Sequence, residues 1–166
     1  MTGAAEAMDY RTALIEAIEG EIAGEAYFEA LAESHSGPAR EALLLMAGVE
    51  RAVTAAVWPL VGRHELPIAD TETLRGQGRD SARKDGAMAW QDFLRDVETG
   101  YQKYVVAYEQ IALQASAGDR ALARLLPDHE VAFIAFARAE MRDGSGADIL
   151  RDFIRRADAL HRPEAR

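Results

Sequence analysis

The stretch GVERAVTAAVWPLVGRH, residues 48–64, has the apolar spacing of a core helix, and one carboxylate interrupts it. Steps of three and four residues lead along one helix face through Leu43, Met46, Glu50, Val53, Val57 and Leu60. An ionised carboxylate on such a face is costly unless a cation, a hydrogen bond or a proton compensates for it. The sequence therefore predicts that Glu50 faces a specific partner inside the protein.

The preceding helix, predicted over residues 4–34, shows the same interruption. Its apolar face carries a glutamate among hydrophobic side chains, in the order Ile18, Ile22, Glu25, Phe28 and Ala32. The segment SHSGP, residues 34–38, ends this helix, and its proline suits the first turn of the next helix, which extends to about residue 62. Two helices joined by a short turn thus each place a glutamate on an apolar face.

The rest of the chain repeats the helical period, and alternating strand patterns are absent. Residues 63–87 form a long polar connection with one short helix after Asp70, and a third helix follows over residues 88–116. Gly118 and Asp119 supply a stop and an N-cap. The fourth helix ends near residue 142, and Pro127 predicts a kink or break inside it. A short amphipathic helix over residues 149–160 covers the bundle.

These elements predict one all-α domain over residues 1–166, built as a four-helix bundle with a short extra C-terminal helix. The long connection lies between the second and third helices, which is the ferritin-like topology with one crossover. Such bundles carry metal near their middle, on glutamate and histidine side chains that project inward.

Composition limits the classes of function. The chain has 166 residues, is 49% hydrophobic and carries a formal charge of −9, which argues against nucleic acid or an anionic membrane as a partner. Long apolar runs and signal-peptide features are not evident, so we expect a cytoplasmic protein. There is no cysteine, so any metal site must use carboxylate and imidazole groups.

Two motifs carry a resemblance to a known family. AGEAYFEALAE around Glu25 and GVERAV around Glu50 resemble the first-helix and second-helix motifs of the rubrerythrin branch of the ferritin-like superfamily, within a similarity that covers residues 10–142. The resemblance implies a di-metal carboxylate site at mid-bundle, oxidoreductase or iron-handling chemistry with oxygen or peroxide, and a homodimer. The family often adds a cysteine-ligated iron domain, so a redox role here would need an external electron donor.

The chain departs from the family pattern at its ligand positions. The family's Glu-x-x-His motif is broken after Glu50 by Val53 and after Glu130 by Phe133, and Lys103 falls where an acidic ligand is expected. The resemblance therefore implies an incomplete site for iron, manganese or another divalent ion. Its candidate ligands are Glu25, Glu50, Glu130 and His129.

A metal-free interpretation stays open beside this one. The glutamates can be paired or protonated, and the chain then serves as a structural or interaction module without a cofactor. Lys103 can neutralise Glu50 if its ammonium points inward. His129 lies on an apolar stripe with Leu126 and Phe133, where histidine is commonly a hydrogen-bonded core residue.

Overall fold

The computed structural model describes residues 9–161, and within this range every regular element is an α-helix. The all-α prediction is confirmed, whereas the predicted first turn at residues 4–8 lies outside the described residues. The helices, in chain order, are α1 (Tyr10–Glu33), α2 (Gly37–Arg63), α3 (Thr71–Asp85), α4 (Trp90–Gly100), α5 (Gln102–Gln114), α6 (Arg120–Ala123), α7 (Leu125–Asp143) and α8 (Ala147–His161).

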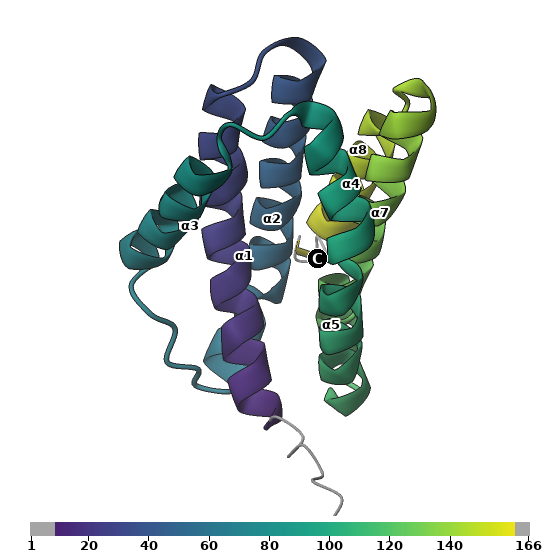
Figure 1. The fold of residues 1–166 in the computed structure, drawn as a ribbon. Helices are drawn as coiled ribbons and strands as arrows, with labels where there is room; N and C mark the ends of the chain where they lie inside the picture. The colour runs from purple at the N-terminus through teal and green to yellow at the C-terminus, as the bar shows by residue number, and fades with distance from the viewer. Residues whose placement is uncertain (1–8, 162–166) are drawn as a thin grey trace, which may run out of the picture.

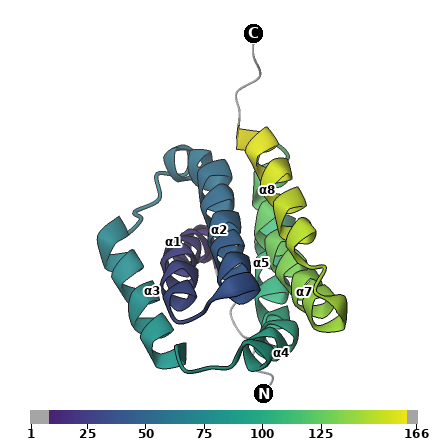
Figure 2. The same cartoon turned by 90° about the horizontal axis from the view of Figure 1, so that it is seen from above.

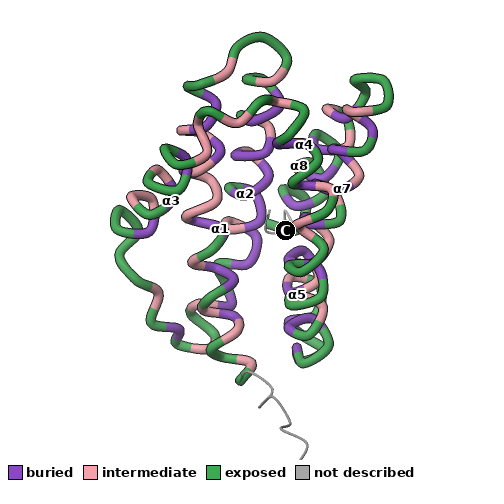
Figure 3. The backbone as a smooth tube through the Cα atoms, in the orientation of Figure 1, coloured by how far each residue is buried: buried purple, intermediate pink, exposed green. Residues whose placement is uncertain are grey.

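The long helices pack as two groups that face each other. α1 and α2 form an antiparallel pair, α3 lies along the outer side of α1, and α4 and α5 pack on α7 (Figure 1). α8 lies across α2 and α7, as the prediction of a covering C-terminal helix required, and Figure 2 shows this from above. The buried faces in Figure 3 line the space between the groups, so the core lies there.

The apolar face predicted for the second helix is confirmed in α2. Leu43, Met46, Val53, Val57 and Leu60 are all fully buried. Long apolar runs are not evident in the sequence, but α2 has the length and the apolar composition that a membrane-crossing helix needs. These two properties are the only basis for that assignment. Half of its most apolar window is buried inside the protein, and the other half is not.

The predicted crossover contains a longer helix than the sequence suggested. α3 has 15 residues and begins after Asp70, whose carboxylate accepts a hydrogen bond from the backbone N–H of Thr73 at 2.9 Å. It packs so closely on α1 that a Cβ atom on Gly78 would overlap the carbonyl oxygen of Ala23. Glycine at this position therefore permits the two helix backbones to touch.

Two of the predicted long helices are interrupted. The third divides at Tyr101 into α4 and α5, although Tyr101 keeps right-handed helical dihedral angles. The fourth breaks at Arg124 into α6 and α7, close to the break predicted from Pro127. Proline lacks an N–H, and its ring crowds the carbonyl four residues earlier, here that of Ala123.

Asp119 does not cap the helix that it precedes, and the predicted N-cap is wrong in this respect. Its side chain makes no hydrogen bond to the backbone of α6. Instead its carboxylate accepts bonds from Arg63 Nη1 at 2.6 Å and His64 Nε2 at 2.7 Å. Burial opposes ionisation, but these two partners outweigh it and lower the pKa of Asp119. The buried carboxylate thereby ties the start of α6 to the end of α2.

Candidate metal centre

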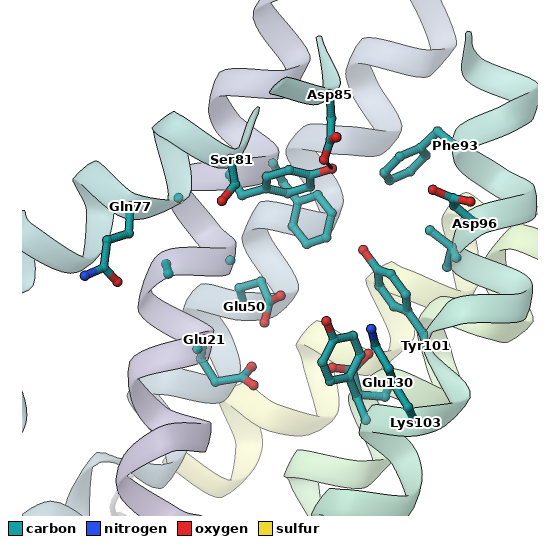
Figure 4. Close-up of a pocket in the computed structure, with 18 of the residues that line it drawn as sticks. Glu21, Glu50, Gln77, Ser81, Asp85, Phe93, Asp96, Tyr101, Lys103 and Glu130 are labelled. Carbon is teal, nitrogen blue, oxygen red and sulfur yellow. Dashed lines mark hydrogen bonds between the residues drawn. The ribbon is translucent and has the colours of Figure 1, made fainter. Parts of the chain in front are cut away.

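Four polar side chains from three helices meet in the middle of the molecule. Glu21 comes from α1, Glu50 from α2, and His129 and Glu130 from α7, and all four are buried. His129 Nε2 lies 3.2 Å from Glu21 Oε2, 3.3 Å from Glu130 Oε1 and 3.5 Å from Glu50 Oε2. Figure 4 shows the three glutamates at the inner end of a cavity. Glu50 thus faces a histidine and two other carboxyl groups.

The histidine ring is oriented by its other nitrogen. His129 Nδ1 lies 3.4 Å from the carbonyl oxygen of Leu125, and because a carbonyl only accepts hydrogen bonds, Nδ1 donates. In the neutral ring this leaves the lone pair of Nε2 directed at the carboxyl groups. A backbone acceptor on the outer nitrogen is the usual way of orienting a histidine that binds metal.

Each of the four residues in this group has a buried side-chain atom that lacks a hydrogen-bond partner in the described part of the chain. Among residues 9–161, no hydrogen bond is made by His129 Nε2 or by the Oε2 atoms of Glu21, Glu50 and Glu130. Carboxylate oxygens and a neutral imidazole nitrogen are all acceptors, so they repel one another when they are brought together. The arrangement requires a positive species between them, which is either bound protons or a cation.

The shifts in the pKa values of these residues indicate where protons bind when the group holds no metal ion. Burial raises the pKa of the Glu50 carboxyl well above its ordinary value, and the charge of Glu21 raises it further. Burial also raises the pKa of Glu21. For His129, burial favours the neutral ring, but the charges of Glu21 and Glu130 outweigh it and raise the pKa to about 9. Without another cation, protons on His129 and Glu50 reduce the repulsion.

Local sequence explains why these side chains point inward. Glu21 lies between Leu14 and Phe28 at heptad spacing on α1, and both of these apolar residues are buried. Gly24, one turn further along α1, leaves room for the partner on α2, because a Cβ atom there would lie 2.6 Å from Glu50 Oε1. The absence of a side chain at Gly24 lets the Glu50 carboxyl lie against α1.

Glu25, the ligand predicted from the first helix, lies elsewhere. Its Oε1 atom accepts a hydrogen bond from Arg51 at 2.8 Å and lies 3.5 Å from Arg75 Nη1. Glu29 binds the same two arginines, so this network joins α1 to α2 and α3 near the surface. The structure therefore brings Glu50, Glu130 and His129 together, as expected from the sequence. The glutamate that α1 contributes to the cluster is Glu21 and not Glu25.

Lys103 does not pair with Glu50, and that interpretation is wrong. Its side chain is exposed, and its ammonium lies 5.0 Å from the centre of the Tyr104 ring. Within residues 9–161 it makes no ion pair. The positive neighbour of Glu50 is His129, a residue that the sequence alone ranked below the glutamates.

Comparison of the chain with protein families, with characterised proteins and with solved structures finds no match.

Proposed function

We propose that this protein is a ferritin-like, rubrerythrin-related bundle that binds one divalent transition-metal ion through Glu21, Glu50, Glu130 and His129. The observation that carries the proposal is the convergence of Glu21, Glu50 and His129, whose ligand atoms lie within 4.8 Å of one another, with Glu130 beside His129. Each of these four residues also has a buried side-chain atom without a hydrogen-bond partner among the described residues. Two helix pairs joined by a long crossover support the family assignment.

The spacing of the group suits one small ion. Ligand atoms bound tetrahedrally at about 2.1 Å from an ion lie about 3.4 Å from one another. His129 Nε2 lies 3.2 to 3.5 Å from one oxygen of each glutamate. The ligand atoms of Glu21, Glu50 and His129 all lie within 4.8 Å of one another, and Glu130 would have to move closer to them to complete a tetrahedral set. One imidazole and three carboxylates fit Fe²⁺, Mn²⁺ or Zn²⁺ better than Ca²⁺, which prefers six to eight oxygen ligands.

The residues present favour one ion over two. A complete di-metal site of this class uses four glutamates and two histidines, and the cluster offers three glutamates and one histidine. Bound iron or manganese would supply redox chemistry with oxygen or peroxide, with electrons from an external donor. The chain's own residues would hold the ion and orient His129 through Leu125.

The proton-bound alternative is a metal-free helical bundle with a structural or interaction role. The raised pKa values of His129 and Glu50 favour it, because bound protons relieve the repulsion without an ion. The two interpretations differ in the effect of Glu50→Leu. Removing a ligand lowers the stability of metal-loaded protein, whereas removing a costly buried acid from metal-free protein maintains or raises stability.

Elemental analysis of protein purified without chelator, followed by calorimetric titration of the chelated protein with Mn²⁺ and Zn²⁺, tests the proposal. We expect the parent protein to bind about one ion per chain. The variants Glu50→Gln and Glu21→Gln should each bind the ion at least tenfold more weakly than the parent. Glu25→Gln is the matched control, because it lies one helix turn from Glu21 but pairs with arginines. It should bind metal like the parent.

Two results would overturn the proposal that this cluster binds a metal ion. One is a parent protein without metal, whose melting temperature is unchanged by chelator or added ions, together with a Glu50→Leu variant at least as stable. The other is equal loss of binding in Glu25→Gln and Glu21→Gln, which would place the ion outside the cluster. Two tightly bound ions per chain would contradict the single-ion site.

A further inference from the structure

A cavity of about 610 Å³ leads from the surface to the glutamate cluster. It lies between the α1–α3 side of the molecule and the α4–α5 side (Figure 4). Its inner end holds Glu21, Glu50 and Glu130, whereas its outer rim holds the exposed residues Gln77, Ser81, Asp96, Lys103 and Tyr104. The volume is in the range of pockets that bind small organic molecules.

The charge of this cavity is strongly unbalanced. Five carboxyl groups line it, those of Glu21, Glu50, Asp85, Asp96 and Glu130. Lys103 is the only basic side chain on its wall within residues 9–161. One divalent ion at the inner end would offset the three glutamates in part and leave the two rim aspartates in excess of the lysine. With or without metal, the cavity therefore favours a cation.

Buried atoms at the inner end support the interpretation of the cavity as a ligand site. The Oε2 atoms of Glu21, Glu50 and Glu130 have no hydrogen-bond partner within residues 9–161, and each side chain is at least nine-tenths buried. At the rim, Asp85 accepts a hydrogen bond from the Tyr27 hydroxyl at 2.9 Å. Asp96 makes no ion pair among the described residues, so its carboxylate is free to bind.

Aromatic rings form the wall between the two acidic ends. The aromatic residues that line the cavity are Tyr27, Phe28, Phe93, Tyr101, Tyr104 and Tyr108. The faces of tyrosine rings attract organic cations, and their apolar surface suits an aromatic or aliphatic body. The Lys103 ammonium, 5.0 Å from the centre of the Tyr104 ring, already makes this kind of contact at the rim.

We propose that this cavity binds a small organic cation with an apolar body, of the arylalkylamine class. The ammonium lies at the rim near Asp96 and the Tyr104 ring, and the apolar body lies along Tyr101 and Phe93. This inference does not rest on the metal proposal, because the rim carboxylates and tyrosines are present whether or not the glutamates hold an ion.

Calorimetric titration with 2-phenylethylamine at pH 7, on both chelated and Mn²⁺-loaded protein, tests the inference. We expect saturable binding of this cation and at least tenfold weaker binding of 3-phenylpropionate, an anion of similar size. Phenethyltrimethylammonium should also bind, because it keeps the positive charge but has no lone pair to coordinate a metal.

Substitutions at the rim locate the ligand. Asp96→Asn should weaken binding of the amine by about threefold to tenfold, because it removes an exposed carboxylate, whose attraction to a cation is screened by solvent. Asp92→Asn, one turn earlier on α4, is the matched control, because Asp92 pairs with Arg95 outside the cavity and should leave binding unchanged. Lys103→Met should strengthen amine binding, since it removes a like charge.

The outcomes separate this inference from the metal proposal. If the protein binds no metal and binds the amine equally well before and after treatment with Mn²⁺, the cavity site is supported and only the metal centre is overturned. Metal binding without amine binding would overturn only the cavity site. Preference for 3-phenylpropionate, or equal loss of amine binding in Asp96→Asn and Asp92→Asn, would also overturn it.

Discussion

At the scale of single residues, His129 controls the charge of the buried cluster. Its outer nitrogen is held by the Leu125 carbonyl, so its inner nitrogen faces three carboxyl groups. The imidazole can meet those groups as a protonated ring or as a metal ligand, and not as both at once. Proton and metal therefore compete for the same nitrogen, and the stability of the protein depends on pH in a different way in each case.

Metal-free protein should lose stability as the pH rises from about 6.5 to 9. The folded pKa of His129, about 9, lies above the ordinary value of 6.5, so its contribution is complete below pH 6.5 and disappears as pH passes the folded value. This change corresponds to about 3 kcal/mol. The raised pKa of Glu50 acts in the same direction.

Urea unfolding in chelator at pH 6.5 and pH 9 measures this effect, with His129→Gln and His35→Gln as a pair of variants. His35 bonds to the Leu31 carbonyl outside the cluster, so its variant should keep the full pH dependence of the parent. His129→Gln should lose most of that dependence. A parent protein equally stable at both pH values would show that His129 does not hold a proton in the cluster.

At the scale of helices, α3 is held on α1 by backbone contact. Gly78 lies against the Ala23 carbonyl, and arginines from α2 and α3 bind Glu25 and Glu29 on the neighbouring face of α1. The long polar connection of the sequence therefore folds into an element that forms one wall of the cavity. The position of that wall depends on a residue with no side chain.

Gly78→Ala should lower the free energy of unfolding by about 3 kcal/mol, because a methyl group cannot fit against the α1 backbone. Gly76→Ala is the matched control on the same helix, where a Cβ atom meets only Arg79 Nη2 at 3.9 Å. It should raise stability by about 0.5–1 kcal/mol through helix propensity. Urea unfolding of both variants measures the difference, and equal effects would contradict the close packing of α3.

Helix positions were more predictable than side-chain partners. Periodicity located α1, α2 and the C-terminal helix, because burial of an apolar face repeats along a helix, and the proline at position 127 predicted the break between α6 and α7. It did not separate Glu21 from Glu25, which lie about 40° apart around α1 and both border apolar residues. The heptad of Leu14, Glu21 and Phe28 was the available signal for Glu21, since Leu14 and Phe28 are buried.

At the scale of the whole molecule, the cluster joins the two groups of helices. Its side chains come from α1 and α2 on one side and from α7 on the other. The sequence predicted that these helices bring Glu50, Glu130 and His129 together, but it gave His129 less weight than the glutamates, because the rubrerythrin Glu-x-x-His spacing directs attention to Phe133, whereas His129 precedes Glu130. Only the packing of α7 against α2 places the histidine beside Glu50. The expected homodimer stays a prediction.

Metal binding should stabilise the whole fold and slow hydrogen exchange most around Glu21, Glu50 and His129. An ion at about one hundred times its dissociation constant adds about 2.7 kcal/mol if it binds only the folded state. Hydrogen–deuterium exchange with and without Mn²⁺ should show added protection in α1, α2 and α7 and less in α3. Protection confined to one helix would contradict an ion shared among three.

The origin of the cluster's side chains in opposite halves of the chain has a kinetic consequence for metal binding. Residues 10–63 can form the α1–α2 pair through contacts close in sequence, but the cluster exists only after α7 docks on it. An ion that binds only the assembled cluster has no affinity for the separate helix pairs. It therefore acts after docking and slows unfolding, while the rate of refolding stays the same with or without it.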